Sequence, residues 1–183
     1  LALLHRRWLA RIPFRIHVAG SRGKSTTTRL IAAGLRRSGV RTIARTTGTK
    51  PRLVLAAGDE RPWRRWGPPS IRELTRLVAI AARERPEALV LECMGIRPEA
   101  LAALERHLVR ATHVVITNAR SDHLENLGTD PDAVAAALAH VVPTGGRLFL
   151  TDEAALPVLV ERARALATSV EVVATQGLPP GEA

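Results

Sequence analysis

The fold of this chain follows from one segment, FRIHVAGSRGKSTTT, at residues 14–28. Phe14 to Ala19 has the apolar character of a short buried strand, and residues 20–23 form a glycine-rich loop. Ser25 to Ser38 then has the spacing of a helix, which Gly39 ends. A glycine loop between a buried strand and a helix is where a protein backbone cradles phosphate. The segment therefore predicts a phosphate-binding loop in an α/β domain.

Strands and helices alternate along the rest of the chain. We expect strands at residues 40–44, 88–92, 112–117, 147–150 and 170–174, with a short extra strand at 53–57. We expect helices at residues 70–85 (opened by a capping box of Ser70 and Glu73), 98–109, 130–142 and 152–166, and irregular structure at 61–69. Such apolar strands are buried on both faces. The predicted fold class is α/β, a mainly parallel sheet with helices on both faces, like P-loop nucleotide-binding domains; ligands of such sheets bind at the carboxyl ends of the strands.

The composition is that of one globular domain. The chain has 183 residues, 46% hydrophobic and 24% charged, enough for one buried core and too few for two ordinary domains. Its single cysteine, Cys93, excludes an internal disulfide and a cysteine metal cluster, which suits a reducing compartment. No apolar run approaches the roughly 20 residues that cross a bilayer. We expect a cytoplasmic protein; the basic segment 1–13 is either a surface helix or the end of a membrane anchor, which would place it at the inner face of the membrane.

The positive charge is concentrated in the first part of the chain. The net charge is +10, and the residues up to Arg76 contain 18 Lys and Arg against three acids. Aromatic residues make up only 3% of the chain, which argues against nucleic acid as a partner because single-strand binders stack bases on aromatic rings. All but two of the 27 basic residues are Arg, the exceptions being Lys24 and Lys50. Lys24 therefore marks a place that suits a compact ammonium group.

The glycine loop carries the groups that nucleotide binding requires. Its backbone N–H groups and the following helix N-terminus would point at the β-phosphate, while Lys24 would neutralise the β- and γ-phosphate oxygens. The hydroxyl group of Ser25 would ligate Mg²⁺. The usual P-loop has a glycine two positions before Gly20, where this chain has Val18. A chance glycine turn is the alternative interpretation.

Two further candidate sites lie at the ends of predicted strands. Glu92 ends a buried strand level with the glycine loop, where a carboxylate could hold Mg²⁺; pairing with one of the many arginines is the alternative. Thr46, Thr47 and Thr49 surround Gly48 after the second strand and offer hydroxyl and N–H groups near the expected γ-phosphate. An ordinary threonine turn is the alternative for them.

The shortened glycine loop resembles that of the Mur ligase superfamily, Gly-x-x-Gly-Lys-Thr/Ser. The resemblance extends over about residues 14–151 and is most specific to the poly-gamma-glutamate synthase subunit family PgsB/CapB. The motifs that carry it are Thr46-Thr47-Gly48-Thr49, Leu91-Glu92-Cys93-Met94, Thr117-Asn118 and Asp122-His123-Leu124-Glu125-Asn126-Leu127-Gly128.

The resemblance implies an ATP-dependent amide ligase that activates a carboxylate as an acyl phosphate to extend poly-gamma-glutamate. It implies ATP and Mg²⁺ as cofactors, a second metal at His123 with Asp122 and Asn118 orienting its loop, and glutamate, the polymer and membrane subunits as partners. Two departures stand out: no lysine follows Lys50 to complete the second metal site, and Glu125 replaces the family's Asp. The family also continues into a C-terminal ligase domain. We expect residues 14–183 to form an ATP-binding, Mur ligase-like domain, with the C-terminal ligase domain absent.

The resulting candidate site combines three kinds of residue. The residues expected to act in catalysis are Lys24, Glu92 and His123. The residues expected to bind the nucleotide cofactor are Gly20, Ser21, Arg22, Gly23, Lys24, Ser25, Thr26, Thr47 and Thr49. The residues expected to ligate metal are Ser25, Glu92 and His123. Other interpretations remain open: another P-loop or Mur-type enzyme such as a folylpolyglutamate-type ligase, a basic module that binds nucleic acid or a membrane surface, and a fragment that binds ATP without completing the reaction.

Overall fold

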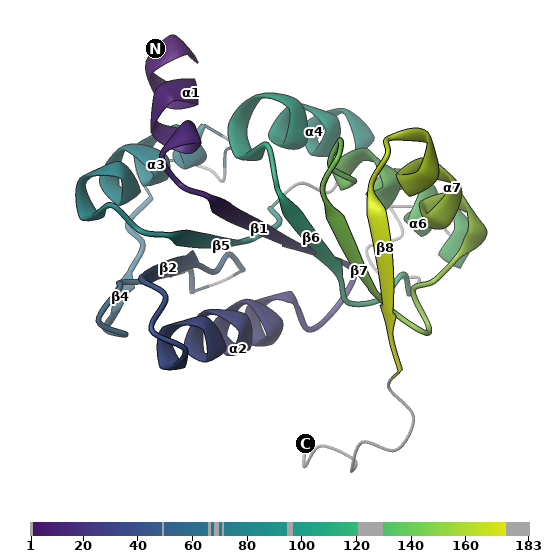
Figure 1. Cartoon of the computed structure of the whole chain (residues 1–183), viewed down its shortest axis with the longest axis horizontal. Coiled ribbons are helices and arrows are strands. Elements are labelled where there is room, and N and C mark those ends of the chain that lie inside the picture. The colour runs from purple at the N-terminus through teal and green to yellow at the C-terminus, as the bar shows by residue number, and fades with distance from the viewer. Residues whose placement is uncertain are drawn as a thin grey trace.

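A computed structural model describes residues 2–48, 50–65, 67, 70, 72–94, 97–120 and 130–174. Strands and helices alternate in it, as the sequence predicts (Figure 1). The strands are β1 (Phe14–Ala19), β2 (Thr42–Arg45), β3 (Arg52–Val54), β4 (Glu60–Pro62), β5 (Ala88–Glu92), β6 (His113–Ile116), β7 (Arg147–Thr151) and β8 (Ser169–Val173). The helices are α1 (Ala2–Ala10), α2 (Lys24–Arg37), α3 (Glu73–Glu84), α4 (Pro98–Ala103), the π-helix η1 (Leu104–Val109), α6 (Pro131–Leu138), the 3₁₀-helix η2 (Ala139–Val141) and α7 (Pro157–Ala165).

The strands form one sheet in the order β4-β3-β2-β5-β1-β6-β7-β8. β1 lies in the middle and pairs in parallel with β5 and β6, while β2, β7 and β8 continue the parallel part. Only β3 and β4, at one edge, run antiparallel to their neighbours among the described strands. The predicted α/β fold with a mainly parallel sheet is confirmed. Its topology brings the carboxyl ends of β1, β2, β5 and β6 to one edge.

Helices cover both faces of the sheet, but the two faces carry different numbers of them. α2 lies on one face, and most of the other helices lie on the opposite face (Figure 1). The face under α2 buries a small core that includes Ile16, Val18 and Val90 from the strands and Ala32 from the helix. The larger core on the opposite face takes the alternate strand residues, such as Leu89 and Leu91 of β5. β5 is therefore apolar on both faces, the pattern expected of a central parallel strand.

Two expected boundaries are wrong for identifiable reasons. Residues 61–69 were expected to be irregular, but β4 begins at Glu60 and pairs with β3. Pro62 fits there because β4 is an edge strand, where a missing N–H group leaves no ladder bond unmade. The helix expected from residue 152 begins instead at Pro157, because proline favours the first position of a helix.

The helices expected at residues 70–85 and 98–109 differ less from expectation. α3 begins at Glu73, with Arg72 rather than the expected Ser70 at its N-cap and no side-chain cap, although the Ser70 N–H donates a 3.4 Å hydrogen bond to Glu73 Oε1. The helix expected at residues 98–109 changes at Leu104 from α4 into the wider turns of η1.

The basic first segment packs on the domain. α1 lies beside α3, and Leu9 and Ile12 are buried in the larger core. His5 Nε2 donates a 2.9 Å hydrogen bond to the carbonyl oxygen of Leu108. None of the helices in the described ranges combines the length and apolar character required to cross a membrane.

Candidate active site at the carboxyl edge of the sheet

The glycine loop turns at the end of β1, in the centre of the sheet. Gly20 has φ +127°, and a Cβ atom there would overlap Thr117 Oγ1 and come within 3.0 Å of the Asn118 carbonyl oxygen. Only glycine fits this position, because the loop passes directly against the end of β6. Gly23, with φ +76°, precedes α2 and turns the chain into the helix.

The residues after β6 hold the loop in shape. Asn118 accepts hydrogen bonds from two loop N–H groups: its carbonyl oxygen from Ser21 (3.2 Å) and its Oδ1 from Arg22 (3.0 Å). Thr117 Oγ1 donates to the Arg22 carbonyl oxygen at 2.7 Å, and Ser21 Oγ donates to that of Arg120 at 2.6 Å. Sequence reasoning assigned Asn118 to its own loop and gave Thr117 no role. Their position at the end of a predicted strand is the signal that the sequence offers, and the pairing of β6 with β1 is what places them against the glycine loop.

Lys24 and the start of α2 form the cationic part of the site. Lys24 Nζ donates to the carbonyl oxygens of Gly20 (2.7 Å) and Ser21 (2.9 Å), so the ammonium group lies over its own loop. The first N–H groups of α2 have no carbonyl partner within the helix, and no side chain caps them at Gly23. Thr26 is exposed in this first turn. An anion at the loop would therefore meet backbone donors, the positive end of the helix dipole and an ammonium group.

Glu92 joins three segments at this edge. Its side chain is buried, and Oε2 accepts a 2.8 Å hydrogen bond from Ser25 Oγ and a 2.6 Å hydrogen bond from the Thr47 backbone N–H. The parallel register explains the meeting, since Val18 of β1 lies opposite Glu92 of β5. The structure therefore brings together the predicted residues Ser25, Thr47 and Glu92, beside Lys24.

The oxygen donors at this point suit a divalent cation. Mg²⁺ prefers carboxylate and hydroxyl oxygens and keeps several waters, so one carboxylate and one hydroxyl are a sufficient protein contribution. Ser25 and Glu92 supply these two groups within hydrogen-bond distance of each other. Within the described ranges no three His, Cys, Asp or Glu side chains cluster in a way that could hold a metal ion. Thr49 and the whole motif at residues 122–128, with Asp122, His123 and Glu125, lie outside the described residues.

A buried ion pair behind the threonine loop escaped sequence reasoning. Arg45, at the end of β2, is 1% exposed and pairs with Glu73 of α3. Its guanidinium group lies 5.0 Å from the ring centroid of Trp63, whose Nε1 donates to Glu73 Oε2 at 2.9 Å. Burial lowers the pKa of Arg45, and the carboxylate of Glu73 opposes that shift. The cluster fixes the strand end from which Thr46 and Thr47 extend.

Comparison with known proteins identifies the class of this fold and site. Residues 18–152 match the Mur ligase middle domain, and the chain belongs to that family. It is 35% identical over 170 residues to the capsule biosynthesis protein CapB of Bacillus anthracis, covering 92% of this chain and 37% of that protein. It is 32% identical over 150 residues to the PGA synthase CapB of Bacillus subtilis, covering 81% of this chain and 38% of that protein. The chain thus spans less than two fifths of either relative.

Solved structures with the same fold include folate enzymes. The bifunctional folylpolyglutamate synthase/dihydrofolate synthase of Yersinia pestis, complexed with AMPPNP and a Mn ion, superposes with a TM-score of 0.67 at 19% identity, covering 93% of this chain and 45% of that one. FolC of E. coli, in complex with DHPP and ADP, superposes with a TM-score of 0.64 at 17% identity, covering 94% and 45%. These likenesses establish the fold.

Proposed function

We propose that this chain is the ATP-binding part of an ATP-dependent amide ligase that extends poly-gamma-glutamate. The observation that carries the proposal is the junction at Glu92, which ties Ser25 of the glycine loop helix to Thr47 of the threonine loop beside Lys24. A phosphate-binding loop, an acidic strand end and a third loop with N–H donors are the parts that phosphoryl transfer needs. The family membership of residues 18–152 supports the same conclusion.

The glycine loop would bind the phosphates of ATP. The unpaired N–H groups at the start of α2 would donate to phosphate oxygens, while Lys24 would exchange its two carbonyl contacts for the β- and γ-phosphates. Thr117 and Asn118 would keep the loop in its binding shape, because they already hold Ser21 and Arg22. Thr47, and Thr49 by the sequence pattern, would contact the γ-phosphate or the acceptor carboxylate.

Ser25 and Glu92 would hold Mg²⁺ through their oxygens. The bound ion would neutralise negative charge on the phosphates during transfer. The Ser25 hydroxyl group would turn from Glu92 to the metal, and Glu92 would keep its bond to the Thr47 N–H, which fixes the carboxylate. His123 stays our proposed ligand for a second ion.

The two CapB relatives and the chemistry of amide ligation support the proposed substrates. ATP would phosphorylate the terminal carboxylate of the polymer, and the amine of an incoming glutamate would attack the acyl phosphate and release phosphate, leaving ADP as the other product. The relatives are named for capsule biosynthesis and PGA synthesis. The strongly basic first part of the chain suits a polymer with a carboxylate on every residue. Membrane subunits of a synthase complex are the proposed partners, at the inner face of the cell membrane.

Calorimetry with ATP and Mg²⁺ tests the proposed nucleotide site. Lys24→Ala should weaken ATP binding roughly 10- to 100-fold, the cost of a charge-assisted phosphate contact. Arg37→Ala is the matched control, because it removes one positive charge from the opposite end of the same helix, α2. Equal ATP affinity in the two variants, or no ATP binding by the wild-type chain, would overturn the proposal. Salt-sensitive binding of duplex DNA without ATP binding would favour a basic binding module instead.

A further inference from the structure

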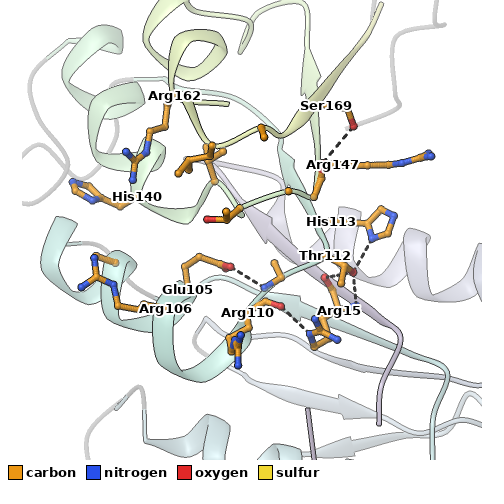
Figure 2. Close-up of a pocket in the computed structure, with 18 residues that line it drawn as sticks. Arg15, Glu105, Arg106, Arg110, Thr112, His113, His140, Arg147, Arg162 and Ser169 are labelled. Carbon is orange, nitrogen blue, oxygen red and sulfur yellow. Dashed lines mark hydrogen bonds between the residues drawn. The ribbon is translucent and has the colours of Figure 1, made fainter. Parts of the chain in front are cut away.

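A hollow lies at the amino edge of the sheet, at the opposite ends of the strands from the glycine loop (Figure 2). Its walls include the start of β1, the starts of β6, β7 and β8, and the ends of η1 and α7. Its volume is about 860 Å³, within the range of small-molecule sites. No residue of the candidate active site contributes to its described lining.

The hollow is strongly basic. Its described lining contains one acid, Glu105, and five arginines: Arg15, Arg106, Arg110, Arg147 and Arg162. Glu105 Oε1 accepts a 2.8 Å hydrogen bond from the Ala111 N–H, and Oε2 is buried without a partner in the described part of the chain. Burial raises the pKa of Glu105 to about 7, so this carboxyl group is only partly ionised at neutral pH and the hollow stays positive.

Of the five arginines, Arg15 has a structural role, and Arg106 and Arg162 are available to a ligand. Arg15 is committed to the protein, because it donates to the carbonyl oxygens of Arg110 at 2.8 Å and Ile12 at 2.6 Å. Arg106 and Arg162 come from different helices and lie on the same side of the hollow as His140, whereas Arg147 points away (Figure 2). Neither Arg106 nor Arg162 forms an ion pair with any acid in the described ranges, and both are exposed.

The arrangement suits several carboxylates better than one phosphate. A compact phosphate prefers converging backbone N–H groups at a helix N-terminus. Here the helix ends at the hollow are C-terminal, at Arg110 after η1 and Leu166 after α7, and they carry partial negative charge. Anion binding must then depend on separate guanidinium groups, each of which pairs with a carboxylate through two parallel hydrogen bonds. Carboxylates spaced along a flexible chain match separate cations.

We propose that this basic hollow binds a chain of carboxylates, the γ-linked glutamate polymer, at a site distinct from the nucleotide edge. The identity of the polymer rests on the proposed function, whereas the anion site itself rests on Arg106, Arg162 and the hollow they flank. Such a site holds the polymer on the domain while its end reacts elsewhere.

Calorimetry of the whole chain with γ-linked hexaglutamate at low salt tests this proposal. The double variant Arg106→Gln/Arg162→Gln should bind the hexamer about 25-fold more weakly, the product of about fivefold for each exposed pair. The control, Arg83→Gln/Arg164→Gln, makes the same change in net charge at exposed positions of α3 and α7 outside the hollow, and should bind like the wild type. Tripolyphosphate is the competing probe, and ATP binding is measured in every variant.

The outcomes separate this inference from the function proposed above. Loss of hexamer binding in the first double variant alone, with ATP binding intact, supports the site. Equal weakening in both double variants, tighter binding of tripolyphosphate than of the hexamer, or no hexamer binding at all would overturn it, and the arginines would then serve only the helix C-termini. Hexamer binding at the hollow by a chain that does not bind ATP would refute the ligase function and leave the anion site standing.

Discussion

Glu105 and His17 make opposite contributions to the pH dependence of stability, and Glu105→Gln separates them. Burial raises the pKa of Glu105 from 4.5 to about 7 in the folded chain. The folded state therefore holds a proton that the unfolded state has released, and the free energy of unfolding falls as pH rises from about 4.5 to about 7. The difference between these pKa values corresponds to about 3 kcal/mol.

His17 acts in the other direction. It lies in β1, 1% exposed, and burial lowers its pKa from 6.5 to about 4. The unfolded state takes up the proton first, so stability is lost as pH falls from about 6.5 to about 4, again by about 3 kcal/mol. The two slopes nearly cancel between about pH 4.5 and about pH 6.5, where the two windows overlap. We expect these two groups together to leave the wild-type stability almost level in that window.

Urea unfolding of the wild type and of Glu105→Gln at about pH 4.5 and about pH 8 measures the difference. The variant keeps an acceptor for the Ala111 N–H and has no charge to bury. It should match the wild type at the lower pH and exceed it by up to about 3 kcal/mol at the higher pH. Glu99→Gln, on the exposed surface of α4, is the control and should show no such difference.

The reasoning would be refuted by a constant difference between Glu105→Gln and the wild type at both pH values, because the carboxyl group would then not titrate near 7. A second variant, His17→Gln, checks the opposing slope. It should gain up to about 3 kcal/mol of stability relative to the wild type when the pH falls from about 6.5 to about 4, because only the Glu105 contribution is left. Identical changes in the two proteins would show that the buried imidazole does not resist protonation.

Two further predictions concern stability. Glu73→Ala leaves the buried Arg45 guanidinium group without its carboxylate and should lower the free energy of unfolding by about 3–5 kcal/mol; a loss below about 1 kcal/mol in urea unfolding would mean that the pair is solvated. Arg85 has φ +47° at the end of α3, a conformation that costs a non-glycine residue about 1–2 kcal/mol. Arg85→Gly should therefore raise the melting temperature, and a decrease would show that this side chain makes contacts worth more than the backbone strain.

Local patterns account for the elements and for the position of the glycine loop. The apolar run of β5, its acid at Glu92, and the glycines at 20 and 23 are features of short stretches, and each follows from backbone or burial requirements that act over a few residues. The errors at β4 and α7 occur where a proline has two interpretations. Pro62 could end a strand or belong to an edge strand, and only its pairing with Arg52 resolves this.

What the sequence alone determined is the class of site: a glycine loop with Lys24 and Ser25 on a parallel α/β sheet. Only the tertiary structure decided which residues, far apart in the sequence, meet at this site and at the amino-edge hollow. Glu92 reaches Thr47 because β2 and β5 are neighbours, and Asn118 reaches the loop because β6 lies beside β1. The arginines of the amino-edge hollow gather for the same reason. Strand order and register bring together side chains that are far apart in the sequence. The burial of both faces of the sheet supplies the free energy that selects this order and register, and that burial depends on the whole chain.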